Sequence, residues 1–480
     1  MSPPLRVAIV HYHLRPGGVT TVIERAVAAL QAHDVQTVVL CGAEPGPERA
    51  GTVRTVPGLD YDDDGDPAGL ADALLDTARE ALGGEPDILH VHNHAVGKSG
   101  LLPCALHELA RRGKKLLLQI HDFAEDGRPG NFRKLVDEVG RGSVTAMAHV
   151  LYPVAPHVHY ALLNLRDLAL LTKAGLPAGF AHHLPNCVTD GETLPPPEGP
   201  PFFVYPTRAI RRKNLGEFLL WSALSEPGAQ WATTLAPNNP AERVYYDSWV
   251  QFAGELRLPV EFEVGTRRQW SLTDLMRAAS AIVTTSVAEG FGLAFLEPWL
   301  SGRPLHGRNI PDVTLDMAEA GLELDNLYNA LLVPVEWIGI DRMRQSVDEG
   351  LQRLFEAYGR PLPAGALEKA CHGLDSRDTV DFGRLDEAMQ RDVIRRVAND
   401  ADAAALLQPP RLAQEPVPAA TIARNQAVVR DKFGPDTYAQ RLLTIYQDLA
   451  ISEPGPLSTL SIESVLDGFL DPSQFRLLRT

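Results

Sequence analysis

The chain has 480 residues, of which 45% are hydrophobic and 22% charged, a composition typical of globular proteins with more than one domain. Acidic residues outnumber basic ones 61 to 45, and the formal net charge is -16. Nucleic-acid binding depends on contacts between basic side chains and phosphates, so this charge argues against a nucleic-acid partner. The four cysteines form no Cys-x-x-Cys pair, which argues against a disulfide scaffold and a cysteine-ligated zinc.

The beginning of the chain and its longest apolar runs bear on where the protein works. Met-Ser-Pro-Pro-Leu-Arg leads directly into a strand-like segment, without the apolar stretch of a secretory signal. No uncharged apolar run reaches the ~20 residues that a membrane-spanning helix needs. We therefore expect a cytoplasmic protein with no transmembrane segment.

Strands and helices alternate in the N-terminal part of the chain. Residues 6–10 form a short apolar run typical of a strand buried on both faces, and the apolar residues of 19–30 have helical spacing. Thr20 and Thr21 stand where hydroxyl groups can cap free N–H groups at the start of that helix. Further strands are expected at residues 37–40, 87–91 and 115–120, and further helices at 68–82 and 100–112. This alternation predicts a parallel sheet covered on both faces, a doubly wound α/β domain.

A proline-rich segment, residues 190–201, divides the chain, because such proline density is incompatible with a helix or a central strand. After this segment, strands and helices alternate again. Strands are expected at residues 202–205, 260–264 and 281–284, and helices at 214–224 and 272–279. The sequence therefore predicts a second α/β domain of the same class.

The first candidate binding loop is Arg15-Pro-Gly-Gly-Val-Thr-Thr21, between the first expected strand and helix. Glycines there let the backbone approach a ligand, and a helix N-terminus favours an anion such as phosphate. The loop has neither the G-x-G-x-x-G pattern of dinucleotide-binding folds nor the P-loop pattern. A plain strand-to-helix turn is the alternative interpretation.

The second candidate is the basic run Arg208-Ala-Ile-Arg-Arg-Lys-Asn214, which follows the first strand of the second domain. Open α/β sheets bind ligands at the carboxyl ends of their strands. Arginine can bind two phosphate oxygens at once, and lysine supplies a point charge. A solvated basic turn is the alternative.

The third candidate is Ser286-Val-Ala-Glu-Gly-Phe-Gly-Leu-Ala-Phe-Leu-Glu-Pro298, where a Glu-Gly-Phe-Gly turn is expected to open a helix. Glu297 follows Glu289 by about two helical turns, so with the first turn partly unwound both carboxylates can face one cleft. Carboxylates accept hydrogen bonds from hydroxyls, and the backbone N–H groups between them bind an anion. This chemistry suits a sugar attached to a phosphate.

These three loops together resemble the retaining glycosyltransferases of the GT-B fold, family 4. Two further stretches are similar to that family: Leu300-Ser-Gly-Arg-Pro304 after the second glutamate, and Pro185-Asn-Cys-Val-Thr189 at the domain junction. Residues 425–449, which predict one or two helices, look like the family's C-terminal helices. The resemblance covers roughly residues 5–312 and 422–450. Thr207, Cys187 and Thr189 depart from the residues usual at their positions in the family.

The resemblance implies the architecture and the division of the chain. It implies an α/β protein of GT-B architecture, with two doubly wound, Rossmann-like domains that face a central cleft. We expect an N-terminal, acceptor-side domain over residues 1–195 and a nucleotide-sugar-binding domain over 196–435. The C-terminal helices, 436–480, would pack back toward the N-terminal domain.

The resemblance also implies roles for individual residues. Arg208 and Lys213 would neutralise the donor diphosphate, Glu289 would hold the donor-sugar hydroxyls, and His121 would lie beside the reacting sugar. Glu297 would bind the ribose of the nucleotide. The remaining donor-binding residues would be Gly17, Gly18, Gly265, Thr266, Gly290, Phe291, Gly292 and Leu293.

The implied activity is transfer of a hexose from a nucleotide-diphosphate sugar, UDP- or GDP-linked, to an acceptor hydroxyl with retention of configuration. No further cofactor and no metal are required by this scheme, and we expect a small soluble acceptor. The oligomeric state is left open, a homo-oligomer included. Two alternatives also stay open: a nucleotide-sugar epimerase of the same fold, and a non-catalytic protein that binds nucleotide sugars.

Residues 314–420 have no counterpart in the family pattern. They include helical stretches at 341–358 and 385–407. We expect this insertion to shape the acceptor pocket or an oligomer contact, because it follows the donor-site helix in the chain.

Two clusters suggest metal binding, but each has a simpler explanation. His90, His92 and His94 alternate along one expected strand, and Asp62-Asp-Asp-Gly-Asp66 resembles part of a calcium loop. The histidines fall where the family lines its cleft, and the aspartate run lacks the downstream glutamate of an EF-hand. We therefore expect no metal at either place.

Overall fold

The computed structural model describes residues 4–44, 51–61, 65–189, 191–195, 197–372, 378–407 and 416–479. The chain forms two compact units. The first comprises residues 1–189 and 431–470, and the second comprises residues 190–430 and 471–480. Each unit is built on a parallel sheet, which confirms the predicted α/β class with two Rossmann-like domains.

Within the described residues, the sheet of the first unit has seven strands in the order β3-β2-β1-β4-β5-β7-β8, and all neighbours are parallel. The strands are β1 (Leu5–Val10), β2 (Val35–Cys41), β3 (Thr52–Thr55), β4 (Ile88–His92), β5 (Leu116–Ile120), β7 (Val158–Leu162) and β8 (Ala181–His183). The strand order reverses between β1 and β4. In doubly wound sheets such a reversal is where ligands bind, at the carboxyl ends of the two strands.

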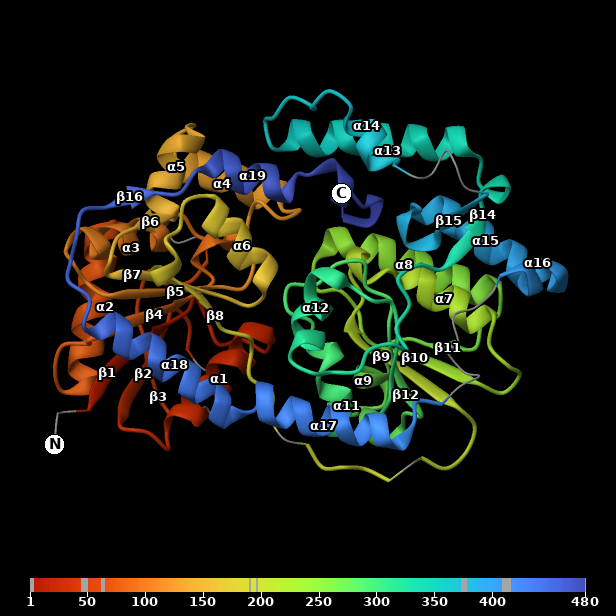
Figure 1. Ribbon diagram of the computed structural model, residues 1–480, viewed down its shortest axis with the longest axis horizontal. Helices are drawn as coiled ribbons and strands as arrows, with labels where there is room; N and C mark the ends of the chain where they lie inside the picture. Colours follow the sequence, from red (N-terminus) through yellow and green to blue (C-terminus); the bar gives the residue numbers. More distant parts are fainter. Residues whose placement is uncertain are drawn as a thin grey trace. The chain divides into compact units, whose positions relative to one another are not determined.

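The helices of the first unit cover this sheet, and two of them, α18 and α19, come from the C-terminal part of the chain. They are α1 (Gly18–Leu30), α2 (Pro67–Leu82), α3 (Leu101–Arg111), α4 (Pro129–Glu138), α5 (Val144–Leu151), α6 (Leu165–Lys173), α18 (Pro435–Ala450) and α19 (Ile462–Phe469). Helix α18 lies beside α1 (Figure 1). Its Tyr438, Leu442 and Tyr446 are buried in the same core cluster as Val7 and Ile9 of β1. The short strands β6 (Pro153–Val154) and β16 (Ser458–Thr459) pair antiparallel.

In the described part of the second unit, the main sheet has five strands in the order β11-β10-β9-β12-β13, again all parallel. The strands are β9 (Phe202–Arg208), β10 (Gln230–Leu235), β11 (Val260–Glu261), β12 (Ala281–Thr284) and β13 (Leu305–Gly307). The helices connected to them are α7 (Leu215–Ala223), α8 (Pro240–Glu255), α9 (Val264–Arg267), α10 (Leu272–Ala278), α11 (Glu297–Leu300) and α12 (Pro311–Glu319). Strand β9 is central, so the loops after β9 and β12 leave the sheet side by side.

The insertion forms its own helices and a small two-stranded antiparallel sheet. Strands β14 (Leu332–Pro334) and β15 (Thr379–Asp381) pair antiparallel. The helices are α13 (Ile340–Ala357), α14 (Ala366–Ala370), α15 (Glu387–Asn399) and α16 (Ala401–Leu406), and α17 (Ala419–Phe433) follows. Helix α15 lies beside α7 of the main sheet domain (Figure 1). None of the helices in the described ranges is long and apolar enough to cross a membrane.

Two local predictions were wrong. Thr20 and Thr21 do not cap N–H groups; their hydroxyls donate to the carbonyl oxygens of Arg15 and Gly17, at 2.6 and 3.2 Å. The strand predicted over 260–264 ends at Glu261, because Glu263 has a positive φ of 59° and turns the chain into α9.

Candidate active site

The basic loop after β9 is fixed to the end of β12 through its backbone. A 3-10 turn covers Arg211–Lys213, and Asn214, with φ of 52°, ends the turn in the left-handed region. The carbonyl oxygen of Lys213 accepts hydrogen bonds from the Tyr205 hydroxyl at 3.2 Å and from Thr285 Oγ1 at 3.0 Å. Tyr205 lies within β9 and Thr285 follows β12 directly, so two adjacent strands hold the backbone of Lys213.

Lys213 and Glu289 form an ion pair at this place. Their side chains are only 17% and 8% exposed. Ser286 Oγ donates to Glu289 Oε1 at 2.6 Å, and the Tyr205 hydroxyl lies 2.6 Å from Ser286 Oγ. Burial alone would raise the pKa of Glu289, but the positive charges of Lys213 and Arg212, together with the hydrogen bonds from Lys213 and Ser286, outweigh it and lower this pKa. The carboxyl group is therefore ionised at neutral pH.

The other cations of the basic run have different partners. Arg208 is exposed and donates to Asn238 Oδ1 at 2.6 Å, in the loop after β10. Arg211 forms an ion pair with Glu387 of α15, with Nε and Oε1 2.6 Å apart. The basic residues that were predicted to form one phosphate-binding cluster thus have separate partners. Lys213 pairs with Glu289 after β12, whereas Arg211 pairs with Glu387 of the insertion.

The segment from Glu289 to Glu297 differs from the helix that we expected the Glu-Gly-Phe-Gly turn to open. The chain makes a 3-10 turn at Leu293–Phe295, and α11 begins only at Glu297. Gly292 has φ of 81°, and a Cβ there would come within 2.7 Å of the Phe295 ring, so the turn requires glycine. The tight turn, rather than two regular helical turns, determines where Gly290, Phe291 and Glu297 lie.

Gly265 and Thr266 lie in α9, which follows Glu263 and packs against β10. A Cβ added at Gly265 would come within 3.2 Å of the carbonyl oxygen of Thr234, near the end of β10. The predicted nucleobase stretch is therefore close to the carboxyl end of the strand next to β9.

Gly17 and Gly18 open helix α1 at the end of the first unit's loop after β1. Gly17 has an extended backbone, which any residue can adopt. A Cβ on Gly17 would meet only Arg15 O, at 3.8 Å, and one on Gly18 would meet no described atom within 4 Å. Packing therefore does not require glycine at these positions, and their predicted contact with the donor phosphates stays a prediction.

His121 lies in a buried group of histidines at the strand reversal of the first unit. His92 Nδ1 and His121 Nε2 are 3.0 Å apart, and the ring of His92 stacks on that of His90 with centroids 4.4 Å apart. His11, after β1, places Nδ1 3.2 Å from the His92 carbonyl oxygen. Burial lowers the pKa of His121 to about 3 and those of His11 and His90 to about 4. These rings are neutral at physiological pH and serve as hydrogen-bonding groups, not as cations.

Asn93 orients His121, a role that the sequence analysis missed. Asn93 has a left-handed backbone, with φ of 62°. Its Oδ1 accepts hydrogen bonds from the backbone N–H of His121 at 3.2 Å and of Asp122 at 2.8 Å. The available signal was an asparagine directly after a buried strand, since asparagine tolerates this conformation and bonds to nearby backbone.

The clusters considered for metal binding have other contacts. Among the described residues, no group of three or more His, Cys, Asp or Glu side chains is arranged to hold a metal ion. His94 Nε2 lies 2.9 Å from the Leu151 carbonyl oxygen. Residues 62–64 lie outside the described residues, and Asp66 caps α2 by accepting from the N–H groups of Ala68 and Gly69.

Comparisons with known proteins point to a glycosyltransferase. The family described as Glycosyltransferase Family 4 matches residues 16–188. The mannosylglucosyl-3-phosphoglycerate synthase of Petrotoga mobilis is 25% identical over 423 residues, which cover 80% of this chain and 79% of that protein.

Solved structures show the same fold at low identity. Anabaena Alr3699/HepE in complex with UDP and glucose aligns with a TM-score of 0.53 and 13% identity, over 92% of this chain and 99% of that one. Sucrose-phosphate synthase from Thermosynechococcus elongatus aligns with a TM-score of 0.52 and 14% identity, over 93% and 99% of the two chains. The predicted resemblance to the family 4 glycosyltransferases of the GT-B fold is confirmed by these comparisons.

Proposed function

We propose that the protein transfers a hexose from a nucleotide-diphosphate sugar to an acceptor hydroxyl, with retention of configuration. The observation that carries this proposal is the partly buried ion pair of Lys213 and Glu289 at the carboxyl ends of β9 and β12. It puts a cation suited to a phosphate beside a carboxylate suited to sugar hydroxyls. Ligands bind open α/β sheets at such strand ends.

In the proposed reaction, the bond between the sugar C1 and the diphosphate oxygen breaks, and its electron pair leaves with the diphosphate. The acceptor oxygen forms the new bond to C1 on the same face, and its proton passes to the leaving phosphate. Lys213 and Arg208 would stabilise the negative charge that develops on the leaving group, which is the largest contribution in this scheme. Glu289 would hold the sugar hydroxyls as an ionised acceptor of hydrogen bonds, and His121 would act as a neutral polar group beside the sugar.

The remaining donor contacts follow the predicted roles. Glu297 would bind the ribose, Gly265 and Thr266 would lie near the nucleobase, and the backbone of residues 290–293 would line the sugar. Gly17 and Gly18 would contribute N–H groups to the phosphates. This scheme uses no metal.

Names of related proteins support the choice of substrates. The Anabaena structure contains UDP and glucose, which supports a UDP-linked hexose as donor. The name of the Petrotoga enzyme refers to a glycosylated phosphoglycerate, which supports a small soluble acceptor. A GDP-linked donor is the second candidate for the test below.

The test is to measure thermal shifts of the wild-type protein with UDP, GDP, ADP and their hexose conjugates. A ligand that binds the native state raises its stability by mass action. We expect one nucleotide to give the largest shift, and Arg208→Ala to reduce it. Product analysis by NMR with the preferred donor and candidate acceptors should then show an α-linked product from an α-linked donor. Inversion would overturn the retaining mechanism, and a released epimerised sugar without acceptor would identify an epimerase.

A further inference from the structure

The insertion contacts the loop that carries Lys213. We propose that Glu387 and Gln390, both on α15, are positioning residues that hold residues 211–214 in the conformation that presents Lys213 to the donor diphosphate. This inference rests on the donor-binding role proposed for Lys213. Neither residue contacts Lys213 in the described structure; each acts on a neighbour of Lys213 in the chain.

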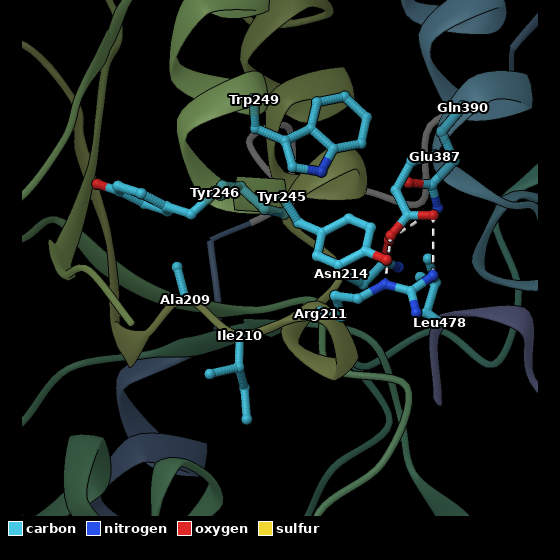
Figure 2. Close-up of a pocket in the computed structure, with 11 residues that line it drawn as sticks. Ala209, Ile210, Arg211, Asn214, Tyr245, Tyr246, Trp249, Glu387, Gln390 and Leu478 are labelled. Carbon is cyan, nitrogen blue, oxygen red and sulfur yellow. Dashed lines mark hydrogen bonds and ion pairs between the residues drawn. The ribbon is translucent and has the colours of Figure 1, made fainter. Parts of the chain in front are cut away.

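Glu387 holds the N-terminal side of the turn through Arg211. Glu387 Oε1 and Oε2 accept from Arg211 Nε and Nη2 at 2.6 and 3.0 Å, a two-pronged arrangement that fixes the guanidinium in direction as well as distance. The two side chains are 13% and 16% exposed. The centroid of the Tyr245 ring lies 4.4 Å from the guanidinium carbon of Arg211. The Leu477 carbonyl oxygen accepts a hydrogen bond from Arg211 Nη2 at 3.4 Å. Figure 2 shows Glu387 and Arg211 facing each other, joined by these two bonds.

Gln390 holds the C-terminal side of the turn through Asn214. Gln390 Nε2 donates to Asn214 Oδ1 at 2.8 Å and to the Phe382 carbonyl oxygen at 3.2 Å. Asn214 in turn donates to Glu217 Oε2 at 2.7 Å. Both amide side chains are fully buried. A Cβ added at Gly216 would come within 2.2 Å of Gln390 Oε1, so any larger residue there would force the Gln390 amide to move.

The space between α15 and the turn is too small for a substrate. The cavity has a volume of about 10 Å³ and is lined by Arg211, Asn214, Tyr245, Trp249, Glu387 and Gln390, among others (Figure 2). That is about the room of one water molecule. We infer that these side chains pack the loop and do not form a second ligand site.

Lys213 is therefore restrained from two directions. Thr285 Oγ1 binds the carbonyl oxygens of Lys213 and Asn214, at 3.0 and 3.1 Å, from the sheet side. Glu387 and Gln390 bind the residues on either side of Arg212 and Lys213 from the insertion side. Catalytic groups must be held within about 0.5 Å of the productive geometry, and a misplacement of ~1 Å can cost about a hundredfold in rate. Helix α15 supplies such restraint although it lies far from Lys213 in the chain.

The test combines Glu387→Gln with Lys213→Ala. If α15 acts through Lys213, Glu387→Gln should lower kcat/KM for the donor by roughly tenfold in the wild-type background, and by less than about twofold when Lys213 is already alanine. The KM for the acceptor should stay unchanged. Gln390→Met, which keeps the volume but removes the hydrogen bonds, should show the same dependence on Lys213.

The matched control is Asp392→Asn on the same helix, where Asp392 forms an exposed ion pair with Arg342. This variant should keep wild-type kinetics. Equal losses from Glu387→Gln in both backgrounds, or no loss in the wild-type background, would overturn the positioning role. If Lys213→Ala keeps the wild-type rate, the proposed function of Lys213 is wrong. If Lys213→Ala lowers the rate but Glu387→Gln leaves it unchanged, only the positioning role of α15 is wrong.

Discussion

Lys213 and Glu289 form a partly buried ion pair although 76 residues separate them in the chain. The pair joins the loop after β9 to the loop after β12, two neighbouring strands of one parallel sheet. Lys213 helps to lower the pKa of Glu289, whereas burial lowers the pKa of Lys213 and the charge of Glu289 offsets part of that effect. Fixed charges of this kind are useful in group transfer, because they need no reorganisation when charge develops on the leaving group.

Replacing Lys213 by alanine should lower kcat by a hundredfold or more, in line with the loss of one group that stabilises transition-state charge (~10²–10³). The measurement is steady-state turnover with the preferred donor at saturating acceptor. Because the single variant also leaves the Glu289 carboxylate buried without Lys213, the double variant Lys213→Ala/Glu289→Gln is the control. It should recover thermal stability without recovering turnover; a near-normal rate in Lys213→Ala would remove this residue from the mechanism.

Replacing Glu297 by alanine should weaken nucleotide binding by roughly tenfold or more, since hydrogen bonds to a charged group contribute about 1.5–3 kcal/mol. Calorimetric titration should compare UDP with its 2′,3′-dideoxy analogue. The wild-type protein should prefer UDP, and Glu297→Ala should bind both equally. A variant that still discriminates against the dideoxy analogue would contradict the ribose-binding role.

Glu125 should make the first unit less stable as the pH rises. It is completely buried, and the Tyr152 hydroxyl lies 3.0 Å from both carboxylate oxygens. Burial raises the pKa of Glu125 from 4.5 to about 7. The folded chain therefore binds this proton more tightly than the unfolded chain, so stability falls between pH 4.5 and 7 and stays lower above that range.

The matched variant for this effect is Glu125→Gln, which keeps the shape without the charge. Relative to wild type, Glu125→Gln should gain stability on going from pH 5 to pH 8, by on the order of 3 kcal/mol. Thermal unfolding at several pH values measures the difference. A constant difference between the two proteins across this range would show that Glu125 titrates normally.

Arg308 should be essential for the stability of the second unit. Its side chain is 6% exposed and donates to Glu217 Oε2 at 2.6 Å and to Asp381 Oδ1 at 2.8 Å. Burial would lower the pKa of Arg308, but the two carboxylates raise it well above its ordinary value. Arg308→Met leaves both carboxylates buried without this partner and should cost about 3–5 kcal/mol of unfolding free energy.

The control for that measurement is Arg342→Met, which breaks the exposed ion pair with Asp392. Exposed pairs contribute ~1 kcal/mol or less, so its midpoint of denaturant unfolding should stay close to that of wild type. Equal midpoints for Arg308→Met and wild type would mean that the buried carboxylates find other partners or become protonated.

The strands of the parallel sheets could be predicted closely from the sequence. The strand predicted over 281–284 has those bounds in the structure, because a strand buried on both faces is a continuous apolar run. The strand predicted to reach Val264 failed because Val264 is buried by a helical turn rather than by the sheet. Apolar character alone does not distinguish these two kinds of burial.

The residues of the candidate site could be named from the sequence, but their partners could not. Lys213 and Glu289 belong to motifs that point to phosphate and hydroxyl chemistry, whereas their contact depends on the order of β9 and β12 in the sheet. The separation of Arg211 from the other cations depends on Glu387, which lies in no motif. Asn93 was missed because its role comes from a backbone conformation.

Helix α18 has a consequence for synthesis of the protein on the ribosome. Its Tyr438, Leu442 and Tyr446 complete the core that β1 and α1 begin, yet residues 190–430 are translated in between. While that stretch emerges, the nascent first unit presents an apolar surface that its own chain has not yet covered. Exposed surface of this kind favours aggregation and recruits chaperones. Chains released before residue 435 should therefore accumulate as chaperone-bound or insoluble products, even though they contain every strand of the seven-stranded sheet.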